Sequence, residues 1–415
     1  MKVAVIGAGV IGVTMAYELT LDGHEVTVFE RRGTAAEEAS FASGSLVAPG
    51  WLASRAQTGW PNPRFWPIDA GLGAWPGPGQ WAWLWRWQRA HRAPQQGQAA
   101  LFQLAQFSHE RLAEITTEEK LEYDRSQGLL VLWRTDREAA QARANLPALR
   151  ELGVSAKELD AAQVRLVEPA LNPDTHLSGA VELSNDSSAN CRQFTLQLKN
   201  LAQARGCDFQ FGCEVVRLNA SQTGVTLTLS AGQASTPLFD AAVLCAGGAS
   251  AALLRPLGVQ VPTQTVWGHS ISAAVREPLD APLSAVMDAR HQVSITRIGQ
   301  RVRVAGGTNL RGERGKPSAS ELRRLYRVLM DWFPGAARLG GPQGSVQEWQ
   351  GAQTLVADGL PLLGESGAPR IWLNLAHGSS GWTLACGCAR ALADRIRGQE
   401  PVADLASFSP LRHKS

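Results

Sequence analysis

The sequence predicts an α/β fold made of two interleaved domains. Its first residues, from Val3 to Glu30, follow a strand–turn–helix–strand pattern that is typical of a parallel sheet. A second strand–loop–helix pattern comes near the other end, from Ile371 to Arg397. Because parallel strands end at one edge of a sheet, we expect both patterns to build one site there. The strand-rich middle of the chain is then an insertion.

The first pattern predicts dinucleotide binding. Val3–Ile6 is a short apolar run, and Gly7, Gly9 and Gly12 follow it at G-x-G-x-x-G spacing. Gly7 permits the tight turn, Gly9 lets a pyrophosphate approach the backbone, and Gly12 lets the helix pack closely on the strand. The start of the helix offers free N–H groups to phosphates. Glu30 closes the second strand, where a carboxylate can bind ribose hydroxyls.

Composition excludes several other classes of protein. A chain of 415 residues can hold two domains. Its net charge of +3 does not indicate a nucleic-acid-binding surface. No apolar run reaches the length of a membrane-spanning helix. Lys2 before an apolar stretch resembles a signal peptide, but glycines and Glu18 interrupt that pattern. The six scattered cysteines indicate reduced thiols in the cytoplasm, and no residue cluster has metal-ligand spacing.

Local patterns predict the remaining elements. Residues 46–50 and 185–188 are expected to be turns, and residues 51–80, rich in Trp, Pro and Gly, an irregular cover over a site. We expect helices at 98–122, 136–152, 155–168, 191–205 and 318–332, and strands at 128–133, 179–183, 207–211, 214–218, 225–229, 241–248, 293–296 and 301–304.

Residues 81–92 have Trp at every second position up to residue 87, and we expect a helix that is apolar at its start and basic at its end. This composition fits a core helix, a contact with a partner subunit, or a helix at a membrane surface.

Together these pieces resemble the superfamily of FAD-dependent amino-acid oxidoreductases that includes D-amino acid oxidase and glycine oxidase, and above all the bacterial D-amino acid dehydrogenases. The stretches that carry the resemblance are 3–32, 40–50, 125–130, 358–364 and 377–387. The resemblance implies a Rossmann-like FAD-binding domain interleaved with an α+β substrate domain on a mainly antiparallel sheet. The FAD-binding domain would comprise residues 1–50, 150–255 and 345–415, and the substrate or cap domain residues 51–149 and 256–344.

The resemblance also assigns residues to FAD. The segment Ser43–Leu46 would face the flavin, and Val215 or Val216 would contact the adenine through the backbone. Backbone N–H groups of Gly378–Thr383 would face the flavin edge where negative charge develops on reduction. The complete set of implied FAD-binding residues is Gly7, Gly9, Val10, Ile11, Gly12, Glu30, Arg31, Arg32, Ser43, Gly44, Ser45, Leu46, Val215, Val216, Ala246, Gly247, Gly378, Ser379, Ser380, Gly381, Trp382 and Thr383.

The substrate half departs from the family pattern. The family commonly has an Arg for the substrate carboxylate where this chain has Gln353, and a Glu where it has Asn309. A neutral amide cannot form the bidentate, charge-assisted pair that Arg makes with a carboxylate. Either another arginine, Arg297 or Arg303, replaces it, or the substrate is not a simple α-amino acid.

Two histidines, His269 and His377, are candidate pocket residues or structural histidines hydrogen-bonded to the backbone, and no catalytic residue is assigned. The resemblance implies an enzyme that takes hydride from the Cα of an amine or amino acid to flavin N5 and passes electrons to a quinone or carrier. The alternatives are a glycine- or sarcosine-type oxidase using O2, and a flavin-binding subunit without its own amine oxidation. We expect a cytoplasmic protein, or one peripheral on the inner membrane face through residues 81–92, with no nucleic-acid partner.

Overall fold

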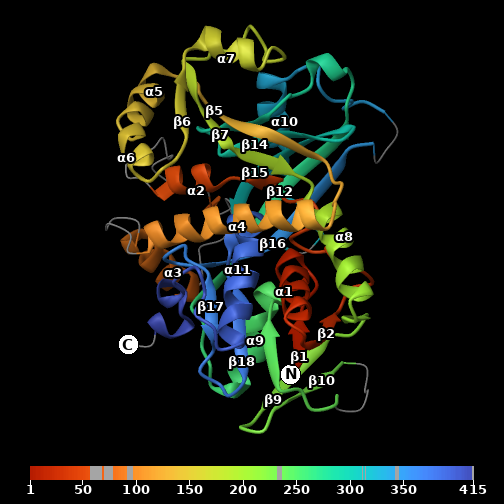
Figure 1. Cartoon of the computed structure of the whole chain (residues 1–415). Coiled ribbons are helices and arrows are strands. Elements are labelled where there is room, and N and C mark those ends of the chain that lie inside the picture. Colours follow the sequence, from red (N-terminus) through yellow and green to blue (C-terminus); the bar gives the residue numbers. More distant parts are fainter. Residues whose placement is uncertain are drawn as a thin grey trace.

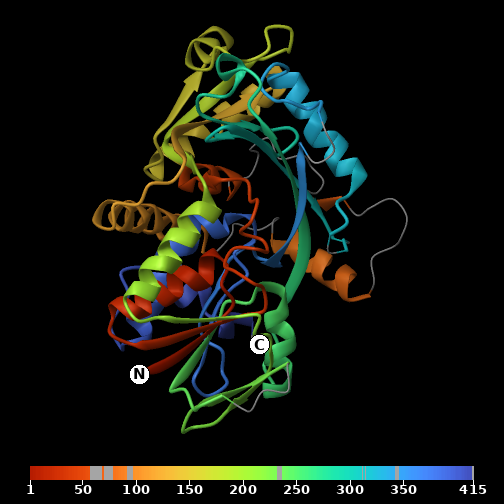
Figure 2. The same cartoon turned by 90° about the vertical axis from the view of Figure 1, so that its right-hand side faces the viewer.

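The computed structural model places two sheets in two halves of the molecule, with the helix α4 (Gln98–Glu118) running between them (Figure 1). Both chain ends lie in the half that holds the six-stranded sheet (Figure 2). The structure describes residues 1–56, 68–69, 78–90, 97–230, 236–310, 312–313, 315–341 and 345–413.

Strands from both ends of the chain form the six-stranded sheet. Its order is β17 (Leu362–Glu365), β18 (Ile371–Leu375), β11 (Ala241–Leu244), β1 (Lys2–Ile6), β2 (Glu25–Glu30) and β8 (Asp208–Phe211). All neighbours are parallel except the antiparallel pair of β17 and β18. Val3 to Ile6 are buried, as expected for a parallel strand covered on both faces. The predicted fold class is confirmed.

Helices cover one face of this sheet. The helix α1 (Val10–Leu21) packs between α8 (Cys191–Ala204) and α11 (Gly381–Ile396), and α4 packs on α11. The rings of Phe194 on α8 and Trp382 on α11 lie 4.8 Å apart in the same core. This packing fixes the starts of α1 and α11 beside one another at the strand ends.

A buried ion-pair network joins three of these helices. Glu18 of α1 is fully buried, and its Oε1 accepts from Nε of Arg111 on α4 at 2.8 Å. Its Oε2 accepts from Nη1 of Arg390 on α11 at 2.7 Å. Arg390 also pairs with Asp22 and Asp394. The network therefore ties α1, α4 and α11 together by charge-assisted bonds in the interior.

The ten-stranded sheet is mainly antiparallel. Its main path is β16 (Gln347–Val356), β12 (Thr263–Ala274), β15 (Arg301–Asn309), β14 (Val293–Ile298), β13 (Ala285–Asp288), β5 (Arg125–Trp133), β7 (Gly179–Ala189) and β3 (Leu46–Val47), with β4 (Ile68–Asp69) beside β15 and β6 (Ala156–Leu159) beside β7. The helix α10 (Ala319–Trp332) buries Leu325, Val328 and Trp332 against this sheet.

Shorter elements complete the fold. They are β9 (Val215–Ala220), β10 (Val225–Leu229), α2 (Pro49–Ala56), α3 (Pro78–Ala90), α5 (Asp136–Arg143), α6 (Leu146–Glu151), α7 (Ala161–Val167), α9 (Ser250–Leu254) and the 3-10 turns η1 (Gly247–Ala249), η2 (Arg255–Leu257), η3 (Pro278–Asp280), η4 (Gly378–Ser380), η5 (Ala406–Phe408) and η6 (Pro410–His413).

Several local predictions were wrong. The expected helix at 155–168 is β6 followed by α7, because Asp160 caps α7 with Gln163 and ends the strand before it. The turn expected at 185–188 is the last part of β7, paired with β3 and β5. The helix expected at 136–152 is divided into α5 and α6.

The segment 46–56, expected to be a turn followed by irregular structure, forms β3 and α2. Asp186 on β7 explains the start of α2, since its carboxylate accepts from the N–H groups of Gly50 and Trp51 at 2.8 Å each. Of the expected cover at 51–80, residues 57–67 and 70–77 lie outside the described residues.

The proposed domain boundaries stay a prediction, with one correction to their membership. The strands β6, β7 and β16 belong to the ten-stranded sheet, although the sequence assigned 150–255 and 345–415 to the FAD-binding domain. Each of them pairs over its length with strands of that sheet. All six cysteines are free, as expected, and among the described residues no helix has both the length and the apolar character needed to span a bilayer.

Candidate cofactor and substrate site

The turn between β1 and α1 is shaped by its glycines. Gly7 has φ +104°, a conformation that glycine adopts without strain. A Cβ at Gly12 would overlap the carbonyl oxygen of Gly7, so only glycine lets α1 approach β1 this closely. A Cβ at Gly9 would meet only Ser40 Oγ, at 3.3 Å. The backbone of Gly9 therefore presents an open surface at the start of α1, where the predicted pyrophosphate would lie.

Glu30 is held at the end of β2 with its carboxylate oriented by the backbone. It is buried, and its Oε2 accepts from Ala8 N–H at 2.7 Å while Oε1 accepts from Arg32 N–H at 2.8 Å. Each oxygen keeps further acceptor capacity for a ribose hydroxyl. Arg31 and Arg32 both donate to Glu38, at 3.2 and 2.6 Å. These two arginines therefore share one neighbouring carboxylate.

Residues 43–46, assigned to the flavin, lie directly against the ten-stranded sheet. Ser45 is buried with φ +61°, which is unusual for a residue with a side chain. Arg303 of β15 donates Nη1 to Ser45 Oγ at 3.1 Å and contacts the Ser43 carbonyl at 3.5 Å. The structure thus gives Arg303 a role in holding this segment. Burial lowers the pKa of Arg303.

The two segments assigned to the flavin meet each other. Thr383, in the first turn of α11, accepts from Ala48 N–H at 3.1 Å and donates to the Leu46 carbonyl at 3.3 Å. Trp382 Nε1 donates to the Ala189 carbonyl at 3.2 Å. Gly378, with φ +56°, begins the turn η4 that leads into α11. The start of α11 and the segment 43–48 therefore form adjoining parts of one site.

The remaining positions assigned to FAD adjoin the same strand ends. Cys245 N–H donates to the Ile6 carbonyl at 2.9 Å, and a Cβ at Gly7 would lie 3.1 Å from Ala246 Cα. Gly247, with φ +52°, follows directly. On β9, Val215 is buried and Val216 is exposed. Cys213, two residues before the start of β9, donates its N–H to the Glu30 carbonyl at 2.9 Å.

These residues fit FAD on two independent observations. The glycine turn leaves the backbone open where a side chain would block a pyrophosphate. In the part of the chain that the structure describes, His377 Nε2 is buried without a hydrogen-bond partner, directly before the segment Gly378–Thr383 that is assigned to the flavin. Buried polar atoms without partners are rare, and polar groups of a bound molecule can satisfy them.

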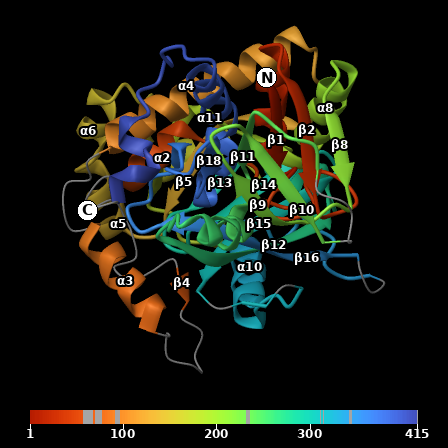
Figure 3. The ribbon, with the colours of Figure 1, turned by 90° about the horizontal axis from the view of Figure 1, so that it is seen from below.

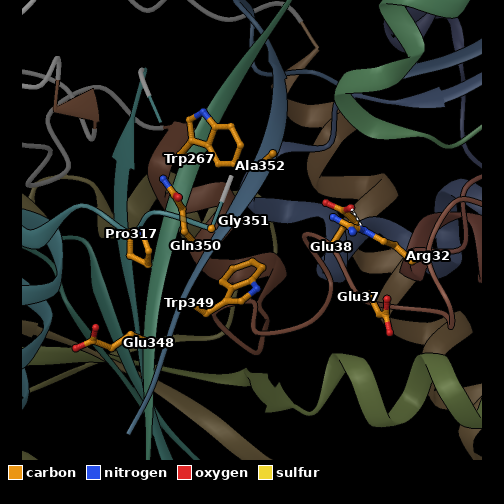
Figure 4. Close-up of a pocket in the computed structure, with 11 residues that line it drawn as sticks. Arg32, Glu37, Glu38, Trp267, Pro317, Glu348, Trp349, Gln350, Gly351 and Ala352 are labelled. Carbon is orange, nitrogen blue, oxygen red and sulfur yellow. Dashed lines mark hydrogen bonds and ion pairs between the residues drawn. The ribbon is translucent and has the colours of Figure 1, made fainter. Parts of the chain in front are cut away.

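A cleft of about 230 Å³ opens between the edge strand β16 and the loop that follows β2 (Figure 4). The indole of Trp349 lies over Gly351 on the strand side, and Arg32 and Glu38 form the opposite wall. Its lining consists of Arg32, Glu37, Glu38, Trp267, Gly315, Pro317, Glu348, Trp349, Gln350, Gly351 and Ala352. The cleft thus lies between a cofactor-assigned residue and the strand that carries Gln353.

Gln353 directly follows the cleft-lining Ala352 on β16, and its amide nitrogen would be 3.0 Å from a Cβ at Gly268 of β12. The next residue on the same face of the strand, Leu355, packs against Gly378, and its backbone is bridged to His377. The face of β16 that carries Gln353 is therefore directed toward the segment assigned to the flavin edge.

The two candidate histidines are both neutral and buried. Burial lowers the pKa of His269 to about 4, and its Nε2 accepts from Ser318 N–H at 3.1 Å. The proton of a neutral His269 ring therefore lies on Nδ1, and a hydrogen bond with the Gly307 backbone partly offsets the lowering of its pKa. Burial lowers the pKa of His377 to about 3. Neither ring supplies a positive charge for a carboxylate near neutral pH.

The two candidate replacement arginines lie at different places on the sheet. Arg303 is beneath the segment 43–45, as described above. Arg297 lies at the other end of β14, where it donates to the carbonyls of Gly299 and Pro278 at 3.2 and 3.4 Å. Asn309, at the expected Glu position, is buried at the end of β15 with Oδ1 unpaired among the described residues.

One charged residue near this site was missed in the sequence. Arg55, in the last turn of α2, donates Nη1 to Ser379 Oγ at 3.1 Å. It is partly buried, burial lowers its pKa, and no carboxylate among the described residues opposes that effect. Its sequence signal was weak but present: Arg55 is the one charged residue between Glu38 and Arg64, directly after the flavin-assigned segment.

Comparison with known proteins extends over the whole chain. The family model described as "FAD dependent oxidoreductase" (DAO) matches residues 2–395. The D-amino acid dehydrogenase of Allorhizobium ampelinum is 33% identical, over 100% of this chain and 99% of its own length. That of Methylobacterium nodulans is 35% identical, over 97% of this chain and 96% of its own.

Solved structures show the same fold at low identity. Glycine oxidase from Geobacillus kaustophilus has a TM-score of 0.78 and 20% identity, covering 99% of both chains. L-proline dehydrogenase from P. horikoshii has a TM-score of 0.76 and 16% identity, covering 100% of this chain and 97% of its own.

Proposed function

The chain belongs to the DAO family of FAD-dependent oxidoreductases, and we propose that it oxidises the CH–NH bond of a D-amino acid or a related imino acid and passes the electrons to a quinone or another carrier. The observation that carries this proposal is full-length similarity, at 33 to 35% identity, to proteins named D-amino acid dehydrogenase. The solved glycine oxidase and L-proline dehydrogenase support the fold only.

In the proposed reaction the substrate loses the Cα hydrogen as hydride and a proton from nitrogen, and bound FAD supplies the two-electron acceptor. Water would then hydrolyse the imine of a primary amino acid to a 2-oxo acid and ammonia, whereas a cyclic imino acid would give a cyclic imine and release no ammonia. The protein's contribution is to bind, orient and exclude water. N–H groups at the start of α11 would stabilise negative charge at the end of β18. Neutral His377 would accept or donate one hydrogen bond there without adding charge.

The carboxylate of such a substrate needs a cation, and Gln353 cannot supply one. If Gln353 serves the substrate unaided, amides and neutral amines should be oxidised as well as the free acids. If an arginine from elsewhere has taken over, the free acids should be preferred. Comparing kcat/KM for D-alanine, D-proline and the matching amides separates these cases.

The helix α3 supports a membrane-side location for the acceptor. Trp83 and Leu84 are buried, whereas Trp85 is 62% exposed and Arg89 lies over its ring at 5.6 Å. Residues 78–90 hold no acidic side chain, and Figures 2 and 3 show α3 at the periphery of the molecule. Exposed Trp and Arg on one helix are typical of contacts with anionic lipid surfaces. His91 and Arg92 lie outside the described residues.

The test of function is anaerobic mixing of the FAD-loaded protein with a panel of D- and L-amino acids, glycine and sarcosine. Bleaching of the flavin by D-amino acids, followed by reoxidation with a quinone analogue faster than with O2, is expected. Rapid peroxide formation with glycine or sarcosine would favour the oxidase alternative. A bound flavin that no amine bleaches would contradict the proposal and favour a subunit without its own amine oxidation.

A further inference from the structure

Among the residues that the structure describes, Arg55 is a cation beside the candidate site without a counter-charge. Its Nη1 donates to a neutral hydroxyl, Ser379 Oγ, and it forms no ion pair among the described residues. Burial lowers the pKa of Arg55, and no carboxylate in the described part of the chain raises it again. A guanidinium stays protonated in proteins, so its desolvation is unfavourable until an anion joins it.

The position of Arg55 brings it to the segments that surround the expected reacting centre. The helix α2 starts directly after Ala48, whose N–H is bonded to Thr383. The last turn of α2 returns to Ser379 in η4. Arg55 is therefore bonded to the loop between β18 and α11, which the family resemblance assigns to the flavin edge.

The same loop contacts the strand that lacks the family's arginine. Gly378, next to Ser379, packs against Leu355 of β16. Leu355 and Gln353 are two residues apart on the strand, so their side chains lie on the same face. Gln353, where the family carries an arginine, and Arg55, which has no carboxylate partner among the described residues, thus lie on opposite sides of the short turn η4.

Arg303 and Arg297 are less well placed than Arg55 to bind a substrate carboxylate. Arg303 contacts the segment 43–45 from the sheet side. Arg297 contacts two carbonyls at the turn after β14. Among the described residues neither arginine is bonded to η4 or β16, whereas Arg55 is bonded to η4 itself.

We propose that Arg55 is the residue that binds the carboxylate of the substrate, in place of the arginine that the family carries at the position of Gln353. The inference rests on the proposed function for the identity of the substrate. It assigns specificity to α2, a segment that follows the flavin loop in sequence, instead of to the ten-stranded sheet.

The first test uses ligand binding to the oxidised, FAD-loaded protein and needs no turnover. Benzoate and benzamide are matched in shape and differ in charge, and their binding is followed by the visible flavin spectrum and by calorimetry. Wild type should bind benzoate more tightly than benzamide. Arg55→Met should weaken benzoate binding about a hundred-fold, as expected when one partner of a buried charge pair is removed. Arg55→Lys should fall between the two because it keeps the charge and loses the fork.

The matched control is Arg297→Met, which removes a guanidinium bonded only to carbonyls and should leave benzoate binding unchanged. A rescue variant adds the decisive comparison. Gln353→Arg in the Arg55→Met background should restore most of the preference for benzoate, since it returns the cation to the other side of the same turn.

Four results would overturn the proposal. They are a wild type that does not prefer benzoate to benzamide, unchanged benzoate binding in FAD-loaded Arg55→Met, equal loss of both ligands, and loss of the preference in Arg303→Met but not in Arg55→Met. A changed flavin potential in Arg55→Met with an intact preference would assign the guanidinium to the flavin instead. If benzoate binding depends on Arg55 but no D-amino acid bleaches the flavin, the proposed function fails while the anion site stands.

Discussion

Replacing His377 by Gln should make the protein more resistant to acid. The imidazole of His377 is buried with Nε2 unpaired, and burial lowers its pKa from 6.5 to about 3. Below pH 6.5 the unfolded chain binds a proton at this residue while the folded chain does not. The free energy of unfolding therefore falls as the pH falls, and the contribution of His377 is fully retained only above pH 6.5.

The size of the effect follows from the shift in pKa. Each unit is equivalent to about 1.4 kcal/mol, so His377 should remove roughly 2 kcal/mol of stability between pH 6.5 and 5. The assay is urea unfolding of the FAD-free protein at several pH values, with wild type and His377→Gln compared at each pH so that the other titrating groups cancel. The exposed His176, replaced by Gln, controls for the loss of one imidazole.

The expected result is a difference between His377→Gln and wild type that grows in favour of the variant as the pH falls. A difference that stays constant from pH 7 to 5 would refute the reasoning, because it would mean that the imidazole is protonated in the folded protein as readily as in the unfolded one. If bound FAD supplies a hydrogen-bond partner for His377 Nε2, the pH dependence of stability should change. Unfolding of the FAD-loaded protein is therefore a second, separate measurement.

Five further substitutions, with Gly33→Ala as a control, test the cofactor site and its support. Gly9→Val should abolish FAD binding and change the stability of the FAD-free protein little. Gly12→Ala should weaken FAD binding and lower stability, because its Cβ overlaps the Gly7 carbonyl, whereas Gly33→Ala, in open space, should leave FAD binding and stability unchanged. Flavin absorbance per chain measures FAD binding, and urea unfolding measures stability. Glu30→Gln should lower FAD affinity at least ten-fold without altering the substrate profile of the flavin that remains bound, and an altered profile would contradict its placement at the adenosine. Glu18→Gln should destabilise the protein by about 1–3 kcal/mol, because it removes the buried carboxylate that Arg111 and Arg390 share, although Arg390 keeps Asp22 and Asp394 and Arg111 keeps Glu114; no measurable loss by urea unfolding would count against the network.

The sequence was most informative where a structural requirement is local. The spacing of Gly7, Gly9 and Gly12 encodes a turn whose close approach to β1 the structure confirms. The strand and loop from Ile371 to Thr383 were predicted for the same reason, since an apolar run and small residues specify a buried strand and a turn within a few positions.

Predictions failed where a distant residue decides the local structure. The polar run at 185–188 has the composition of a turn but forms part of β7. Its Asp186 carboxylate accepts from the N–H groups of Gly50 and Trp51 at the start of α2, which lie 136 and 135 residues earlier in the chain. Arg55 was missed because its environment is set by Ser379, 324 residues away. No local periodicity records such contacts.

The order of strands in the six-stranded sheet also constrains how the protein is made. The strand β1 is paired on one side with β2, which follows it at once, and on the other with β11, which starts at residue 241. During synthesis one edge of β1 therefore stays unpaired until more than half of the chain has been assembled. The helix α11, which covers α1, is made later still. An N-terminal half-chain would expose an apolar strand edge that favours aggregation, so the nascent protein should depend on chaperones.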